Sequence, residues 1–129
     1  MNNGTSRILA IDPGEQTGIS YVQDGHFVWG MVCHSQVFDS EDFIFSLTKI
    51  TDPTTIVIES PPTSVTHYNK TQYEIYNVLC HKYRIAGFKV VSLNPGLWKK
   101  LIVRTKIDAT HIRDAADMAR FQHAKGIKK

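Results

Sequence analysis

The chain has 129 residues, of which 42% are hydrophobic and 21% are charged, the size and composition of one globular domain with a core of its own. Its apolar runs are short and no basic segment followed by an apolar stretch opens the chain, so we expect no membrane-spanning helix and no signal peptide. The net charge of +3 does not by itself indicate a partner.

The charge is divided unevenly along the chain. Residues 1–59 hold two basic and eight acidic side chains, a net charge of −6, whereas residues 60–129 hold thirteen basic and four acidic ones, a net charge of +9. A basic second half favours a polyanionic partner, because lysine and arginine neutralise phosphates. A solvated, lysine-rich surface is the alternative.

The two cysteines, Cys33 and Cys80, lie far apart and match no metal-ligand spacing. This pattern predicts two reduced thiols in a reducing compartment, so we expect a cytoplasmic protein.

The first part of the chain predicts an antiparallel meander. Arg7–Asp12 is a short apolar run that ends at an acid and a Pro-Gly turn, which indicates a strand. Thr17–Val22 and His26–Cys33 predict two more strands, and the Asp-Gly pair between them is a strong hairpin signal.

The rest of the chain alternates helices and strands. Phe43, Leu47 and Ile50 recur at helical spacing in the helix predicted over Glu41–Ile50, and the β-branched run Thr55–Glu59 predicts a strand buried on both faces. The order, βββαβαβαα, is that of an α/β fold, a mixed five-stranded sheet flanked by helices. The remaining predicted elements are a helix over 70–86, a strand over Lys89–Leu93, a short helix from Asn94 to Leu101 and a last helix from Thr110 that stops at Gly126.

Acidic residues stand where the predicted elements converge. Asp12 ends the first strand, and Glu59 ends the fourth inside an apolar run, where a carboxylate is costly to desolvate unless something positive binds it. Asp114 and Asp117 lie three residues apart on one helix and therefore share a face, with His111 three residues earlier.

Oxygen ligands from separate elements suit a hard divalent ion such as Mg²⁺, and two ions about 4 Å apart would assist phosphodiester cleavage. Each acid also has an ordinary explanation. Asp12 equally fits a turn acid, and Asp114 and Asp117 taken alone are better explained by a solvated helix face. Glu59 is the hardest to explain in that way, and the set as a whole favours a metal site.

Three motifs carry a resemblance to a known family. IDPGEQTGIS at Ile11–Ser20 resembles the opening motif of RuvC-type Holliday junction resolvases, an acid followed by Pro-Gly and Thr-Gly. IVIES at Ile56–Ser60 resembles their glutamate motif, and DAADMA at Asp114–Ala119 resembles their C-terminal helix. The order and spacing agree, and the resemblance touches most of the chain.

The resemblance implies a single RNase H-like nuclease domain over residues 1–129, a homodimer, Mg²⁺ or Mn²⁺ with two ions per site, and paired nicks across a four-way DNA junction. By motif position, Asp12, Glu59, Asp114 and Asp117 would be the catalytic metal ligands. Some members have a histidine three residues before an aspartate of this helix, which leaves the register open. His111 would then position water or substrate, although an ordinary helix histidine fits nearly as well.

The chain departs from the family after the fifth strand, where a Gly-rich segment is missing. The resemblance gives a DNA-binding role to the basic residues that remain, although a solvated basic loop is about as compatible. This compact form resembles a phage or viral relative, so we expect the protein to be located in the cytoplasm of a bacterial or virus-infected cell. The residues concerned are Lys99, Lys100, Arg104 and Lys106.

Tyrosines follow the glutamate motif. Tyr68 is a candidate to wedge into the junction and stack on a base, but packing against the following helix fits it better. Tyr73, Tyr76, Cys80 and Tyr83 recur at helical spacing, which predicts a core or dimer interface.

Three other functions compete with junction resolution. An RNase H-like nuclease could act on flaps, RNA–DNA hybrids or RNA instead, and a module with this fold could bind junctions without cutting them. Acid-Gly-Thr-Gly turns also cradle phosphates in nucleotide-binding proteins, but those need two such domains.

Overall fold

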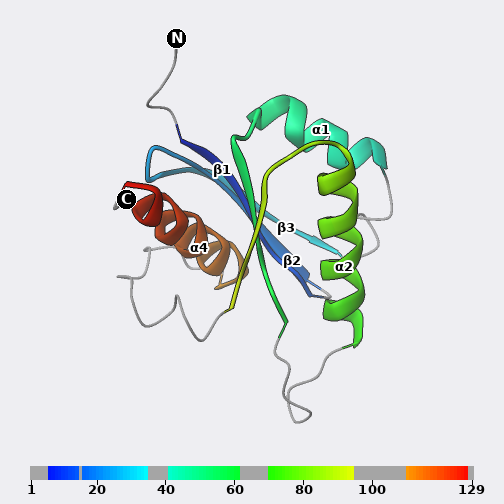
Figure 1. Cartoon of the computed structure of the whole chain (residues 1–129). Helices are drawn as coiled ribbons and strands as arrows, with labels where there is room; N and C mark the ends of the chain where they lie inside the picture. The colour runs from blue at the N-terminus through cyan, green and yellow to red at the C-terminus, as the bar shows by residue number, and fades with distance from the viewer. Residues whose placement is uncertain (1–5, 15, 35–40, 62–69, 95–109, 128–129) are drawn as a thin grey trace.

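The computed structural model describes residues 6–14, 16–34, 41–61, 70–94 and 110–127. These residues form a mixed sheet with α1 and α2 on one face and α4 on the other (Figure 1). The strands are β1 (Arg7–Asp12), β2 (Gln16–Gln23), β3 (His26–His34), β4 (Thr55–Glu59) and β5 (Val90–Leu93), and the helices are α1 (Glu41–Thr51), α2 (Lys70–Ile85) and α4 (Thr110–Ile127).

The five strands lie in the order β3-β2-β1-β4-β5. β1, β2 and β3 are antiparallel neighbours, and the turn between β2 and β3 has positive φ at both Asp24 (51°) and Gly25 (84°), as a tight Asp-Gly hairpin requires. β4 runs parallel to β1, and β5 runs parallel to β4. The carboxyl ends of β1, β4 and β5 therefore meet at one edge of the sheet.

Alternate residues of the central strands enter two separate cores. On the side of α1 and α2, Leu9 and Ile58 are fully buried with Leu79 and Tyr83. On the other side, a second cluster joins the sheet to α4. Its buried members are Ile8, Ala10, Val22, Val57, Leu93, Ala115, Ala116, Met118 and Ala119.

Small residues and one hydrogen bond fix the direction of α4 across the sheet. The hydroxyl of Ser20 on β2 donates to the carbonyl oxygen of Ile112 at 2.7 Å. At the other end of the helix, His123 lies against Gly25, where an added Cβ would be 3.0 Å from His123 Cδ2. Since Ser20 is two residues from Gly18, the partner of Asp12 across the ladder, α4 begins near the carboxyl end of β1 and runs toward the hairpin.

The predicted α/β fold class is confirmed. β1 and β4 have the predicted bounds, and the bounds of the other described elements differ from the predicted ones by at most one residue at either end. The last helix does not stop at Gly126 but continues to Ile127. The short helix predicted from Asn94 to Leu101 falls almost entirely outside the described residues.

The buried face of α1 does not include every apolar residue at the helical spacing of Phe43, Leu47 and Ile50. Ile50 is 73% exposed, whereas Leu47, Thr48 and Thr51 are buried. The contact face is thus rotated toward two threonines that hydrophobicity alone does not identify. Thr51 is tolerated there because its hydroxyl donates to the carbonyl oxygen of Leu47 at 2.7 Å.

Candidate active site

Asp12 and Glu59 occupy adjacent positions at the ends of two neighbouring parallel strands. Ile11 pairs with Ile58 in the β1–β4 ladder, and each acid is the next residue of its strand. Because side chains alternate along a strand, each acid lies on the same side as the residue two positions earlier. Those residues belong to the core under α4, so both carboxylates lie on the α4 side of the sheet.

Both carboxylates are removed from water, with Asp12 7% and Glu59 5% exposed. Both residues interact with their surroundings. The buried Oε2 atom of Glu59, however, makes no hydrogen bond to the described part of the chain. Two buried carboxylates on adjacent strands disfavour one another's ionised form unless a positive charge stands nearby.

The turn after Asp12 is closed by a reciprocal pair of hydrogen bonds. The hydroxyl of Thr17 donates to the carbonyl oxygen of Gly14 at 2.9 Å, and the amide N–H of Gly14 donates to Thr17 Oγ1 at 3.2 Å. Thr17 is completely buried. The Pro-Gly and Thr-Gly parts of the opening motif therefore form one fixed turn that holds the end of β1 in place.

Two of the remaining predicted site residues, His111 and Asp114, lie in the first turns of α4. His111 and Asp114 are helical, but their side chains lie outside the described part of the structure. The helix rises 1.5 Å per residue, so the backbone at Asp114 is roughly 4.5 Å nearer the start of α4 than that at Asp117. That is the end of the helix closer to Asp12 and Glu59.

Asp117 is fully buried and pairs with a basic side chain of its own helix. Its Oδ1 atom lies 3.8 Å from Arg120 Nη1, and the Arg120 side chain is 33% exposed. Sequence reasoning missed this partner, although a base three residues after an acid in a helix is a recognisable signal. Among the side chains that the structure describes, no three acids, histidines or cysteines come together as a metal-binding group. Asp12, Glu59 and Asp117 are therefore not brought together as one such group.

The predicted DNA-binding residues are not tested. Tyr68, Lys99, Lys100, Arg104 and Lys106 all lie outside the described residues.

The stripe on α2 divides between core and surface. Cys80 and Tyr83 are buried in the core, which is one of the two places predicted for this stripe, whereas Tyr73 and Tyr76 are half-buried.

Both cysteines, Cys33 and Cys80, are buried and form no disulfide, and burial raises the pKa of the Cys80 thiol. In the described part of the chain, no helix is long and apolar enough to cross a membrane.

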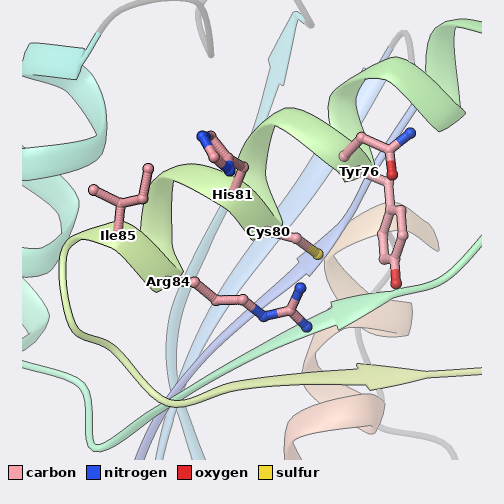
Figure 2. Close-up of a pocket in the computed structure, with 6 residues that line it drawn as sticks. Tyr76, Cys80, His81, Arg84 and Ile85 are labelled. Atoms are coloured by element: carbon pink, nitrogen blue, oxygen red, sulfur yellow. The ribbon is translucent and has the colours of Figure 1, made fainter.

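Sequence reasoning also missed a hollow beside α2, on the opposite face of the sheet from Asp12 and Glu59. It has a volume of about 460 Å³. Figure 2 shows Tyr76, Cys80 and Arg84 pointing from α2 toward the neighbouring strands, whereas His81 and Ile85 point away from them. The hydroxyl oxygens of Tyr76 and Ser92 on β5 lie 2.5 Å apart and join the helix to the sheet edge. The lining residues are Tyr76, Asn77, Cys80, His81, Arg84 and Ile85.

The sequence matches no protein-family model and no curated protein. The fold, in contrast, matches solved structures. A Thermus thermophilus RuvC structure has a TM-score of 0.73 at 11% identity, and T. thermophilus RuvC in complex with a Holliday junction substrate has a TM-score of 0.71 at 13% identity; each match covers 95% of this chain and 96% of the other. The yeast mitochondrial Holliday junction resolvase Ydc2 matches with a TM-score of 0.60 at 11% identity, over 92% of this chain and 78% of that one.

These matches define the class of fold. The chain has the RuvC-type, RNase H-like fold that the motifs predicted, with a mixed five-stranded sheet flanked by helices.

Proposed function

We propose that this chain is a single-domain, metal-dependent endonuclease that cuts branched DNA, four-way junctions above all. The observation that carries the proposal is the convergence of Asp12 and Glu59, two buried carboxylates at adjacent strand ends, at the end of the sheet where α4 begins. The likeness of the fold to junction resolvases supports the choice of substrate.

The residues present fit a hard divalent cation. Asp12 and Glu59 offer carboxylate oxygens from two strands, and α4 adds acids at Asp114 and Asp117, a set that suits Mg²⁺ or Mn²⁺. When bound, two such ions would activate a water molecule and stabilise the leaving oxygen at a phosphodiester. Because this end of the sheet is buried, a cation here would also relieve the repulsion between the carboxylates.

The chain's own groups would hold and orient the substrate. The turn closed by Thr17 and Gly14 fixes the end of β1, and the core under α4 fixes the helix that carries the remaining acids. His111 would position water or a substrate oxygen. Lys99, Lys100, Arg104 and Lys106 would hold the DNA backbone, and Tyr68 would stack on a base near the branch point. Since phosphate contacts carry no sequence information, selectivity would come mainly from the shape of the junction.

A pair of nicks on opposite strands needs two active sites, so the working enzyme would be a homodimer on one junction. Its expected location remains the cytoplasm of a bacterial or virus-infected cell.

Nicking of a synthetic four-way junction tests the proposal. The wild type should make symmetric cuts with Mg²⁺ and none with EDTA, and Glu59→Gln should abolish them because a metal-binding carboxylate is lost. Glu74→Gln is the matched control: its side chain is 64% exposed on α2, and its activity should equal that of the wild type.

Flap, RNA–DNA hybrid and single-stranded RNA substrates belong in the same experiment. Faster cleavage of one of these than of the junction would replace the proposed substrate and keep the nuclease. Tight junction binding without cuts in any metal would indicate a binding module instead.

A further inference from the structure

One row of residues crosses the whole sheet at the level of the two acids. Leu93 pairs with Glu59 on the β5 side. On the other side, Gly18 of β2 pairs with Asp12, and Val32 of β3 pairs with Gly18. Residues paired directly across a ladder share a face of the sheet, so the row lies on the α4 side with both carboxylates. The acids therefore have neighbours on β5 in one direction and on β2 and β3 in the other.

The two ends of this row differ in their exposure to solvent. Leu93 is 6% exposed and belongs to the core under α4, whereas Val32 is 39% exposed. Gly18 adds no side chain between Val32 and Asp12, and a glycine inside a strand is a position at which a ligand can approach the backbone closely. From the acids, the row is therefore closed toward β5 and reaches solvent on β3.

The next row toward this end of the sheet adds two polar residues. Gln16 of β2 pairs with His34 of β3, and both residues are exposed. Each stands two positions from a member of the first row and therefore lies on the same face. With neighbouring strands about 4.8 Å apart, Val32 lies roughly 10 Å from Asp12, and His34 lies about 7 Å farther along β3. We call Gln16, Val32 and His34 the β2–β3 strip.

Packing on both faces of the sheet fixes the position of the β2–β3 strip. Thr17 and Cys33 alternate with the strip residues and are buried on the opposite face, so a slip of register would expose them. One row inward on the α4 side, Ser20 donates to the carbonyl oxygen of Ile112, and Gly30 lies against the Ile112 side chain. The strip is therefore held at a constant distance from Asp12.

The chemistry of the strip suits a sugar–phosphate chain. Neither β2 nor β3 contains an acidic residue, so a polyanion meets no carboxylate from either strand. The amide of Gln16 and the imidazole of His34 can donate hydrogen bonds to phosphate oxygens, and the methyl groups of Val32 can pack against a deoxyribose. DNA advances about 3.4 Å per nucleotide along its axis, so the strip lies a few nucleotides from a phosphate held at Asp12.

We propose that the β2–β3 strip binds the DNA strand that is cut, on one side of the cleavage point, through a phosphate contact made by His34. The inference deepens the proposed function and rests on it for the substrate. It assigns DNA binding to two strands that contain no lysine or arginine, which a search for basic residues does not identify. Contacts to phosphates position the strand and carry no sequence information, so the strip fixes where the strand lies and does not select its bases.

Fluorescence anisotropy of a labelled four-way junction in EDTA, where no cutting is expected, tests the proposal. His34→Glu should raise the dissociation constant about tenfold or more, because it removes a donor and places a negative charge against a phosphate. His34→Arg should lower the dissociation constant about threefold and steepen the slope of log Kd against log salt concentration by about one, because it adds a charged phosphate contact.

His26 provides the matched control within the same strand. It is also an exposed histidine, but it begins β3, whereas His34 ends it, and it pairs with Gln23, whose side chain alternates with that of Val22 and so lies away from α4. His26→Glu and His26→Arg should therefore stay within about twofold of the wild type in junction binding. Circular dichroism should show all four variants folded.

Nicking of the same junction with Mg²⁺ separates the strip from the metal site. His34→Glu should raise KM more than it lowers kcat, because the phosphate contact is made before the chemical step and is kept during it. Equal behaviour of His34→Glu and His26→Glu in both binding and KM would overturn the strip and leave the nuclease standing. Binding that depends on His34 as expected, without cuts, would contradict the nuclease and leave the strip standing. No binding and no cutting by the wild type would contradict both.

Discussion

At the scale of single residues, Tyr83 shows how far packing outweighs hydrogen bonding in this core. Its ring is fully buried and meets Phe88 edge-on, with ring centres 6.0 Å apart. Its hydroxyl oxygen is buried and has no hydrogen-bond partner among the residues that the structure describes. A buried hydroxyl without a partner costs more than it contributes, so Tyr83 stabilises the core through its ring.

Tyr83→Phe should leave the free energy of unfolding unchanged or raise it by about 1 kcal/mol, whereas Tyr83→Ala should lower it by about 3–5 kcal/mol. Urea denaturation at neutral pH measures both. A clear loss of stability in the phenylalanine variant would show that the hydroxyl does have a partner in solution.

The same residue predicts a pH dependence. Burial raises the pKa of Tyr83 above its ordinary value of 10.0. The folded protein therefore holds this proton more tightly than the unfolded chain does. The contribution of this proton to the free energy of unfolding is fully present below pH 10. It is lost as the pH rises from 10 toward the higher pKa of the folded state. Tyr83→Phe should flatten this alkaline loss in denaturation curves measured between neutral and high pH; identical curves for both proteins would contradict the assignment.

At the scale of elements, the contact between β3 and α4 depends on the absence of a side chain. A Cβ at Gly30 would collide with Ile112 Cγ2 and would lie 3.0 Å from the backbone carbonyl oxygen of Ile19. The isoleucine side chain can move, but the β2 backbone cannot move without disturbing the sheet. The missing side chain of Gly30 thus lets the first turn of α4 lie close against β3.

Gly30→Ala should lower the free energy of unfolding by about 1–3 kcal/mol because it overpacks this contact. In the Ile112→Ala background, Gly30→Ala should lower the free energy of unfolding by less than it does in the wild type, because the clash with Ile112 is gone. Part of the loss should remain, because the clash with the Ile19 carbonyl oxygen remains. Thermal denaturation of the four proteins completes the cycle. Full stability in Gly30→Ala would mean that α4 lies farther from β3 than described.

At the scale of the whole molecule, local signals were sufficient for the sheet. The Asp-Gly pair at 24–25 identified the hairpin, and the β-branched run Thr55–Glu59 identified the central parallel strand, because these signals depend on backbone conformation and burial alone. The convergence of Asp12 and Glu59 also followed from sequence, since both end strands that become neighbours. The topology confirms that they share one end of the sheet.

The remaining features depend on contacts between elements, which no local pattern contains. Thr51 rather than Ile50 faces the core because of how α1 lies on the sheet. The burial of Asp117, the counter-charge of Arg120 and the hollow beside α2 likewise appear only when the helices are placed.

Binding of Mn²⁺ in the absence of DNA tests most directly the claim that Asp12 and Glu59 form a divalent-metal site. Electron paramagnetic resonance of free Mn²⁺ titrated with the protein would measure it for the wild type, Asp12→Asn, Glu59→Gln and the control Glu74→Gln. The wild type and Glu74→Gln should bind the ion equally. Asp12→Asn and Glu59→Gln should each weaken binding by about tenfold or more, because each removes one carboxylate ligand. Wild-type affinity in both Asp12→Asn and Glu59→Gln, or no binding by the wild type, would contradict the site.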